Sequence, residues 1–285
     1  MTAFNKNFEI GKFMRKVKKD FLADKENWCD LKNFQFTNGF YSTYENKAYN
    51  KIHMEQYYIL KFFPMYFQEY MYAYEIFLES YDKENLKVLS IGVGSGVDYY
   101  ALKEVLNNKN ISLDYTGVDI VDWKYRTSEI NFIHTDILNL DKIYFEDVDL
   151  VVFPKSLIEL EDNRLKYITE SIKKTASEKL SFLNTYVKKG QKVSGVDEFK
   201  IINQGLVNSH YKLCEENDTE RYYTDDDQRA KIDYPISYYE WKDELENYCS
   251  GCNQDQIDRC NIAQYPMLYQ KHMAFNVLNY TNEGL

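Results

Sequence analysis

Val88-Leu89-Ser90-Ile91-Gly92-Val93-Gly94-Ser95-Gly96 is a short apolar run that ends in three glycines at alternate positions. A continuous apolar run of this length is typical of a strand that is buried on both faces, as in a parallel sheet. Glycine tolerates the backbone angles needed where such a strand turns sharply into a helix. Because it has no side chain, glycine also lets a ligand lie against the backbone at the carboxyl end of the sheet. The stretch therefore predicts a strand, a tight turn and a helix that together bind a ligand.

Outward from this motif, apolar runs alternate with helical patterns towards the C-terminus. Further strands are predicted at residues 113–119, 131–135, 148–153, 180–187 and 272–280. Helices are predicted at residues 99–106, 155–175 and 199–207. This alternation is typical of βαβ units, and it predicts an α/β fold with a mostly parallel sheet and helices on both faces.

Residues 1–85 are predicted to form a separate helical region. Apolar residues recur at helical spacing from Ile10 to Phe21, with lysines on the other face. A long aromatic run follows at residues 57–81, and Pro64 is expected to kink or divide its helix. Two interpretations of the aromatic residues stay open. They either line a substrate pocket, or they pack helix against helix or in a homodimer interface.

Residues 86–285 are predicted to form the sheet domain, with an insertion at about residues 228–262. The insertion contains Cys249 and Cys252, and Cys260 follows nearby. A tetrahedral zinc site needs four ligands, and a second Cys-x-x-Cys pair is missing, so no metal site is predicted. The odd total of 5 cysteines fits reduced thiols in a cytoplasm.

Composition and charge restrict the classes of partner. A hydrophobic content of 44% supports a real core, and the net charge of −10 is repelled by the phosphate backbone of nucleic acids. The basic run Lys12–Lys19 nevertheless keeps an RNA or DNA partner open as a less favoured interpretation. Charged residues interrupt the aromatic run, so no membrane span is predicted and the expected location is the cytoplasm.

The spacing of the three glycines separates one family of ligand-binding sheets from others. The dinucleotide-binding fingerprint G-x-G-x-x-G would need a glycine at position 97, where this chain has Val97. A P-loop is excluded because no Gly-Lys-Ser/Thr follows. The pattern G-x-G-x-G resembles that of the class I methyltransferases that depend on S-adenosylmethionine (SAM), although no subfamily signature is recognised. This resemblance implies a Rossmann-like, mostly parallel, seven-stranded sheet, SAM as the cofactor and methyl transfer as the reaction.

The resemblance also implies which residues hold the cofactor. The carboxylate of Asp119, at the end of the second strand, would bind the ribose hydroxyls. Asp136 would accept from the adenine amino group while Ile137 lies against the ring, and the fourth strand would lead into the catalytic mouth. The implied cofactor-binding residues are Ser90, Gly92, Gly94, Ser95, Gly96, Asp98, Asp119, Ile120, Asp136, Ile137, Phe153 and Pro154.

The chain departs from the family pattern at two places. An acidic residue often stands two positions before the first glycine, but here that residue is Ser90, and Asp98 is the candidate to compensate for it. Methyltransferases that act on exocyclic base amines usually carry Asn/Asp-Pro-Pro-Tyr/Phe after the fourth strand. The corresponding stretch here is Phe153-Pro154-Lys155-Ser156, which weakens the case for base methylation. An aminopropyltransferase, a related alternative, would need an acidic residue at the position of Phe153, so methyl transfer is favoured.

Methyl transfer demands no obligate catalytic residue, because the cofactor is already activated. Glu159 is a candidate general base, and Lys155 is a candidate to hold an anionic substrate. In the alternative interpretation, Ser156 caps a helix and Glu159 lies in its first turns. The sequence therefore predicts a methyltransferase acting on a small molecule, with a nucleic-acid methyltransferase and a non-catalytic SAM-binding protein as alternatives.

Overall fold

The computed structural model describes residues 9–23, 52–107, 109–174, 178–189, 192–193, 196–214, 221–222, 253, 255–256 and 273–284. Most of the predicted insertion at residues 228–262 and the cysteines Cys249, Cys252 and Cys260 lie outside these ranges. The chain divides into two units, and each is described by itself. The first comprises Met1–Tyr66, Trp123–Tyr125 and Ala230–Gln270, and the second comprises the rest.

Helix α1 (Glu9–Ala23) belongs to the first unit and confirms the predicted amphipathic pattern. The side chains of Ile10, Met14, Val17 and Phe21 are buried, because a spacing of three or four residues places them on one face of the helix. The basic side chains between them, such as Lys12, Arg15, Lys16 and Lys19, are exposed. The basic run is thus the outer face of a helix.

Helix α2 (Ile52–Glu79) continues through Pro64, so the prediction that this proline could divide the helix is wrong. A proline in a helix interior costs about 3 kcal/mol, because it removes a hydrogen bond and clashes with the preceding turn. Phe63 and Met65 on either side of the proline are almost fully buried, and the burial of such side chains offsets this cost. None of the helices in the described ranges combines the length and apolar character needed to cross a membrane.

Aromatic rings of α1 and α2 pack against one another inside the first unit. Phe21 stacks on Tyr57 with 6.5 Å between ring centroids, and Tyr58 meets Trp123 edge-on at 5.5 Å. Tyr57 is buried and Tyr58 only half-buried. Within this unit the aromatic residues therefore act as a core, which favours the packing interpretation over a substrate pocket.

The short segment Trp123–Tyr125 follows the second strand but belongs to the first unit. The carboxylate of Glu55 accepts the backbone N–H groups of Lys124 (2.9 Å) and Tyr125 (3.3 Å). The side-chain amide of Gln56 donates to the hydroxyl of Tyr125 at 2.7 Å. Two adjacent residues of α2 thus hold this segment in place.

The second unit is built on a sheet whose main path has the strand order β3-β2-β1-β4-β5-β9-β7 in the described part of the chain. Strands β1 to β5 pair in parallel, while β9 runs antiparallel between β5 and β7. This arrangement confirms the predicted mostly parallel seven-stranded sheet, to which β6 and β8 add short antiparallel pairs. The strands are β1 (Asn85–Ile91), β2 (Ser112–Asp119), β3 (Asn131–His134), β4 (Leu150–Pro154), β5 (Lys179–Lys189), β6 (Lys192–Val193), β7 (Tyr211–Leu213), β8 (Arg221–Tyr222) and β9 (Met273–Asn282).

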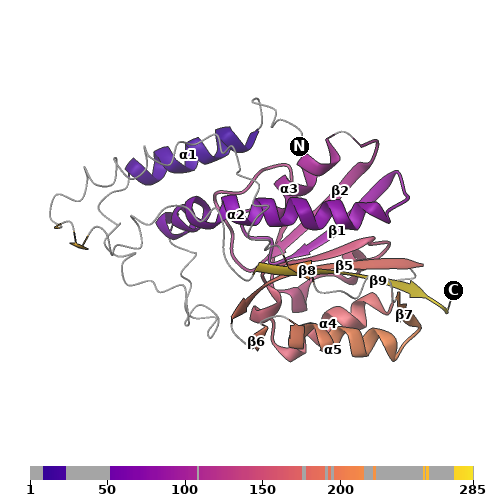
Figure 1. Cartoon of the computed structure of the whole chain (residues 1–285). Coiled ribbons are helices and arrows are strands. Elements are labelled where there is room, and N and C mark those ends of the chain that lie inside the picture. The colour runs from indigo at the N-terminus through magenta and orange to yellow at the C-terminus, as the bar shows by residue number, and fades with distance from the viewer. Residues whose placement is uncertain are drawn as a thin grey trace. The chain divides into compact units, whose positions relative to one another are not determined.

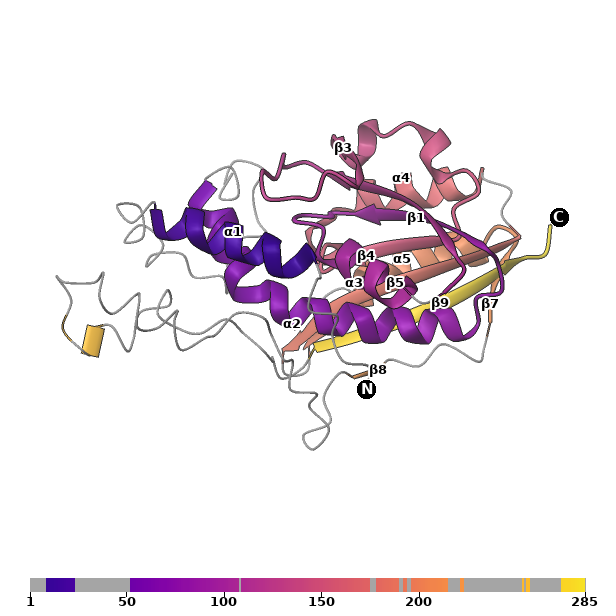
Figure 2. The same cartoon turned by 90° about the horizontal axis from the view of Figure 1, so that it is seen from above.

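Helices cover both faces of this sheet, as predicted. Figure 1 shows α3 (Val97–Leu106) on one face, and α4 (Asp162–Ile172) and α5 (Val196–Val207) on the other. The part of α2 that belongs to this unit, from Phe67 onwards, lies on the same face as α3, as the view from above shows (Figure 2). Three short 3-10 helices complete the unit, namely η3 (Ile137–Asn139), η4 (Lys142–Phe145) and η5 (Leu157–Glu159).

The helix predicted at residues 155–175 needs a correction. The chain instead forms a turn at Lys155, the short η5, and only then α4 from Asp162. The reason is a backbone φ of 65° at Lys155, which no α-helix accommodates. The residues after β4 therefore remain at the edge of the sheet before the chain turns back along it.

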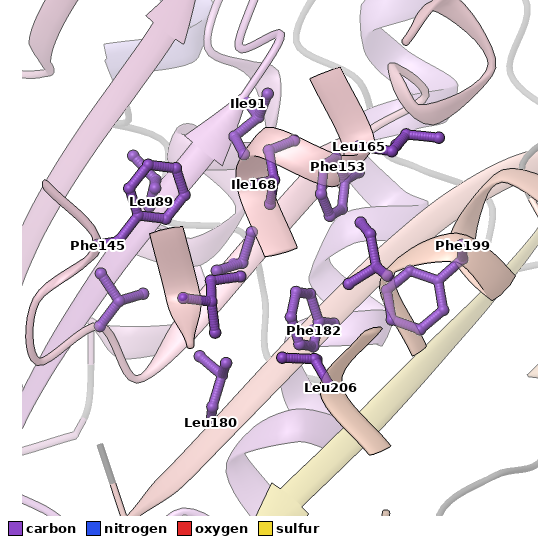
Figure 3. Close-up of a cluster of buried hydrophobic side chains, with 14 of the residues drawn as sticks. Leu89, Ile91, Phe145, Phe153, Leu165, Ile168, Leu180, Phe182, Phe199 and Leu206 are labelled. Atoms are coloured by element: carbon purple, nitrogen blue, oxygen red, sulfur yellow. The ribbon is translucent and has the colours of Figure 1, made fainter. Parts of the chain in front are cut away.

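One buried core of the second unit lies between the sheet and the helices α4 and α5 (Figure 3). Phe182 of β5 stacks on Phe153 of β4 at 6.4 Å and meets Phe199 of α5 edge-on at 5.2 Å. Both strand residues are fully buried. The apolar runs that predicted the strands are thus explained by burial on both faces.

Strand β1 lies between β2 and β4, so the order of the strands reverses at the β1/β4 junction. The chain leaves β1 for α3 on one face, and it leaves β4 for α4 on the other (Figure 1). In open α/β sheets, ligands bind outside the carboxyl ends of the strands at such a switch point. The residues after β1, β2 and β4 are therefore the candidates for a ligand-binding site.

Candidate functional site at the carboxyl edge of the sheet

The loop after β1 is shaped by glycines in the left-handed region of backbone space. Gly92, Gly94 and Gly96 have φ values of 76°, 54° and 77°. A side chain would also collide with neighbours, since a Cβ on Gly92 would lie 2.5 Å from the Cβ of Ser156, and one on Gly96 2.5 Å from Ile130 Cδ1. The predicted role of these glycines in a tight turn is confirmed, and Gly96 is the residue before α3.

The carboxylate of Asp119, at the end of β2, holds this loop in place. One oxygen accepts the N–H of Gly94 at 2.8 Å, and the other accepts the N–H of Val121 at 2.9 Å. Each carboxylate oxygen can accept a second hydrogen bond, so Asp119 retains capacity for two further donors. Burial raises the pKa of Asp119 to about 6, although its backbone hydrogen bonds oppose the rise. The arrangement suits a ligand that presents two hydroxyl groups.

Ile120 and His134 lie beside this carboxylate. Ile120 is 49% exposed, so its side chain is accessible to a flat ligand group. His134, which pairs in register with Asp119 across β2 and β3, has its Nε2 3.0 Å from the carbonyl oxygen of Ile120. His134 was not among the site residues predicted from the sequence. Its place at the end of the third strand was the available signal.

Ser90 and Asp98 occupy different positions from those predicted. Both side chains are fully buried, and the Ser90 hydroxyl donates to the Asp98 carboxylate at 2.8 Å. The hydroxyl of Tyr115 on β2 donates to the same carboxylate. Burial raises the pKa of Asp98 to about 6. Because neither side chain reaches the surface, we correct the prediction of direct cofactor contact and assign them to joining β1, β2 and α3 beneath the loop.

Asp136 is likewise engaged within the protein. Its carboxylate accepts two hydrogen bonds from the guanidinium of Arg164 (2.8 and 3.2 Å) and one from the N–H of Leu138 (3.0 Å). Partial burial alone would raise the pKa of Asp136, but the hydrogen bonds and charge of Arg164 outweigh this effect and hold it below its usual value. Ile137 is 4% exposed and belongs to the core. The Ile137 side chain is thus turned into the core, whereas an adenine contact of Asp136 stays a prediction, since its Oδ2 accepts only one hydrogen bond.

Two more predicted contacts differ in the same way, while a third, Pro154, does not. The side chain of Phe153 is fully buried in the core, and that of Ser95 is 3% exposed. Only the backbone of these two residues borders the edge of the sheet. Pro154, the last residue of β4, is half-buried and stays a candidate.

Lys155 is held inside the protein, which contradicts the prediction that it binds an anionic substrate. Its ammonium lies 2.6 Å from the carboxylate of Glu69 on α2 and 3.2 Å from the carbonyl oxygen of Tyr186. Glu69 is fully buried. Burial lowers the pKa of Lys155 and raises that of Glu69 to about 7, although the pair's mutual attraction opposes both shifts. The charge of Lys155 is thus balanced by Glu69, which lies 86 positions away in the chain. Glu69 was not among the residues predicted from the sequence.

Glu159 is the remaining catalytic candidate, and its side chain is exposed. The hydroxyl of Ser156 donates to the carbonyl oxygen of Ile91, so Ser156 does not cap the following helix through its side chain as the alternative interpretation proposed. Partial desolvation of the Glu159 carboxylate disfavours its charge although the side chain is exposed, and the negative charge of Asp119 repels it. Together these effects raise its pKa to about 7. Glu159 and Asp119 are therefore two electrostatically coupled carboxylates at one edge.

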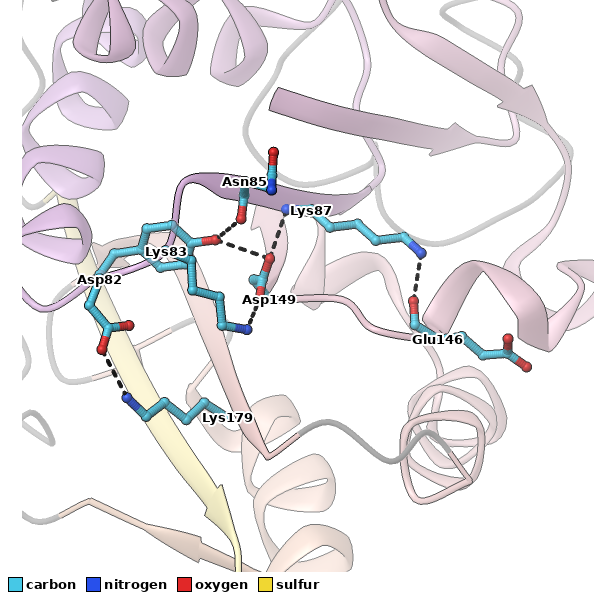
Figure 4. A network of polar contacts seen from close by, with 8 residues as sticks. Asp82, Lys83, Asn85, Lys87, Glu146, Asp149 and Lys179 are labelled. Atoms are coloured by element: carbon cyan, nitrogen blue, oxygen red, sulfur yellow. Dashed lines mark hydrogen bonds and ion pairs between the residues drawn. The ribbon is translucent and has the colours of Figure 1, made fainter. Parts of the chain in front are cut away.

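A pocket of about 620 Å³ opens at the opposite end of the strands, where β5 begins. Its wall contains a polar network in which Asp149 accepts from the ammonium of Lys83 (2.6 Å) and from the N–H of Lys87 (2.9 Å) (Figure 4). Lys179 pairs with Asp82 at 3.4 Å. These charges balance one another, so the network anchors the turn before β1 and offers no excess charge to a ligand.

The chain resembles known proteins only at low sequence identity. No family model matches the chain, and no curated protein matches it. Among solved structures, the plantazolicin methyltransferase BpumL with SAH (S-adenosylhomocysteine) and a substrate analogue is 14% identical with a TM-score of 0.44, over 94% of this chain and 99% of that one. Magnesium protoporphyrin IX methyltransferase from Synechocystis PCC 6803 with bound SAM is 10% identical with a TM-score of 0.40, over 99% of both chains. A TehB-like SAM-dependent methyltransferase from Corynebacterium glutamicum is 12% identical with a TM-score of 0.39, over 75% of this chain and 86% of that one. Similarity at this level does not identify the cofactor or the reaction of this chain.

Proposed function

We propose that this protein is an enzyme that binds SAM at the carboxyl edge of its sheet and transfers the methyl group to a small molecule. The observation that carries the proposal is the contact between the glycine loop and Asp119, in which the N–H of Gly94 lies 2.8 Å from the carboxylate. This contact supports the proposal because a carboxylate that can accept hydroxyl groups lies next to a glycine backbone, beside a topological switch point.

The residues present fit the chemical groups of SAM. Gly94 leaves the loop backbone open to a ligand, while Gly92 and Gly96 allow the turn to pack against Ser156 and Ile130. The free acceptor capacity of Asp119 suits the two ribose hydroxyls. The exposed side chain of Ile120 suits the adenine ring. SAM supplies a methyl group activated by a positively charged sulfur.

In this proposal, the residues of the chain bind the cofactor and orient it towards the methyl acceptor. Asp119 fixes the sugar, the glycine loop fixes the adjoining part of the cofactor, and the turn after β4 borders the place where the acceptor must approach. The excess of acidic over basic residues gives no support to a long nucleic acid as the acceptor. The odd number of cysteines is in keeping with a cytoplasmic location, which stays a prediction.

Two substitutions test the cofactor site. Asp119→Ala removes the acceptor of the ribose hydroxyls, and charge-assisted hydrogen bonds of this kind are worth about 1.5–3 kcal/mol each, so SAM affinity should fall at least tenfold. Gly94→Val places a branched side chain on the loop at a φ of 54° and should abolish binding. Isothermal titration calorimetry with SAM and SAH measures both effects.

Asp122→Ala is the matched control. Asp122 lies three residues after Asp119, is 68% exposed and only approaches Arg126 at 4.0 Å. It should leave SAM affinity within twofold, and circular dichroism should show native secondary structure for all three variants. Unchanged affinity in the folded Asp119→Ala and Gly94→Val variants, or no binding of SAM by the natural protein, would overturn the proposal.

A further inference from the structure

The turn after β4 is pressed against the glycine loop after β1. The hydroxyl of Ser156 donates to the carbonyl oxygen of Ile91, and a Cβ on Gly92 would overlap the side chain of Ser156. The segment from Ser156 to Glu159 therefore borders the β1/β4 switch point directly, and η5 ends at Glu159. A ligand group lying beyond the glycine loop would meet this segment next.

The polar side chains of this segment differ in direction. Lys155 turns inward to Glu69, and Ser156 turns inward to Ile91. Glu159 is exposed, and its carboxylate has no hydrogen-bond or ion-pair partner in the part of the chain that the structure describes. Within residues 155–159 it is thus the polar side chain that remains available to a ligand.

The charges around Glu159 favour a positively charged ligand group. Asp119 is the charged residue that acts on Glu159, and it repels a second negative charge. Nearby cations are already engaged, since Lys155 pairs with Glu69, and Arg164 pairs with Asp136. An ammonium at Glu159 would relieve the repulsion between two carboxylates, whereas an anionic group would add to it.

We propose that the methyl acceptor is a primary or secondary amine, whose ammonium form pairs with Glu159 and gives up its proton to that carboxylate. This inference rests on the proposed function. The neutral nitrogen attacks with its lone pair, so that a nitrogen–carbon bond forms while the bond from carbon to sulfur breaks and its electron pair stays on sulfur. The proton that nitrogen loses ends on Glu159 and then passes to water, so atoms and charges balance.

Other acceptors fit Glu159 less well. A carboxylate or thiolate would be repelled by two carboxylates at the same edge. A neutral hydroxyl gains no attraction from Glu159 beyond one hydrogen bond, and its proton is held far more tightly than a carboxylate can remove. An amine gains both the ion pair with Glu159 and a carboxylate placed to accept its proton.

The experiment compares pools of small fragments that differ only in the acceptor group. Primary and secondary amines, alcohols, thiols and carboxylates on matched aromatic and aliphatic bodies are each incubated with SAM, and SAH formation is measured. Binding of the same pools to SAH-saturated protein is followed by ligand-observed NMR, which requires no turnover. Glu159→Gln keeps the size of the side chain and removes its charge. Asp162→Asn, at an exposed residue three positions later, is the matched control.

We expect amines alone to bind SAH-saturated protein and to yield SAH. Glu159→Gln should lower the rate about 100-fold or more, as expected for loss of a general base, and should abolish amine binding. It should leave SAM affinity within threefold, Asp162→Asn should change nothing, and Glu159→Asp should restore part of the rate. Turnover in another pool, turnover in none of the pools, or equal loss of SAM affinity in Glu159→Gln would overturn the inference while the proposed SAM site stands. Failure of the natural protein to bind SAM would instead remove the proposed function itself.

Discussion

At the scale of single residues, Asp119 combines two tasks that compete for its charge. Its carboxylate orders the glycine loop through Gly94 and is proposed to hold the ribose. Burial has already raised its pKa to about 6, so the protein without ligand keeps it ionised at neutral pH by a narrow margin. Donated hydrogen bonds favour the ionised form, and binding should therefore be coupled to deprotonation of Asp119.

This coupling predicts a pH dependence of SAM affinity. Below the pKa of Asp119 the acid is protonated before SAM binds, so affinity should be highest at pH 7.5 and about tenfold weaker at pH 5, one unit below that pKa. Calorimetry across this range measures the change. Asp119→Asn should bind weakly at every pH, and Glu159→Gln should keep the decline near pH 6. A constant dissociation constant in the natural, folded protein would contradict this assignment.

At the scale of elements, the loop after β1 and the turn after β4 depend on each other. Ser156 fills the space that the missing side chain of Gly92 leaves. We expect Gly92→Ala to destabilise the protein by about 2–5 kcal/mol, because it adds the cost of a left-handed backbone to that of overpacking. Urea unfolding measures this loss of stability.

The double variant Gly92→Ala/Ser156→Gly separates the two costs. Removing the side chain of Ser156 relieves the overlap but leaves the φ of 76° unfavourable for alanine. The double variant should therefore be more stable than the sum of the single effects predicts, by about 1–3 kcal/mol. Strict additivity would mean that the two segments do not contact each other in solution.

At the scale of the molecule, the core on the α4 and α5 side of the sheet contributes to the stability of the second unit. Phe182 is fully buried there between Phe153 and Phe199. Phe182→Ala should lower the free energy of unfolding by about 3–5 kcal/mol, and urea unfolding followed by circular dichroism would measure it. Val207→Ala, at a side chain that is 52% exposed on α5, should change it by less than about 0.5 kcal/mol. Similar small losses in both variants would argue against this core.

The predictions from sequence succeeded where local chemistry determines structure. Apolar runs of strand length and helical repeats are properties of neighbouring residues, so the sheet, its helices and the glycine turn could be predicted before any contact was known. The ends of elements were less certain. The helix expected at residues 155–175 begins only at Asp162, because the backbone at Lys155 takes a conformation that only its packed surroundings stabilise.

Which polar side chains face a ligand was decided by the tertiary structure alone. Asp136 meets Arg164, 28 positions away, and Lys155 meets Glu69, 86 positions away, so both are neutralised within the protein. Asp119 and Glu159 keep capacity for a ligand because no lysine or arginine in the described part of the chain forms an ion pair with them. Sequence spacing can place a charged residue at the end of a strand. The partner of that residue depends on chain segments brought together only by folding, since burial and ion pairing act through space and not along the chain.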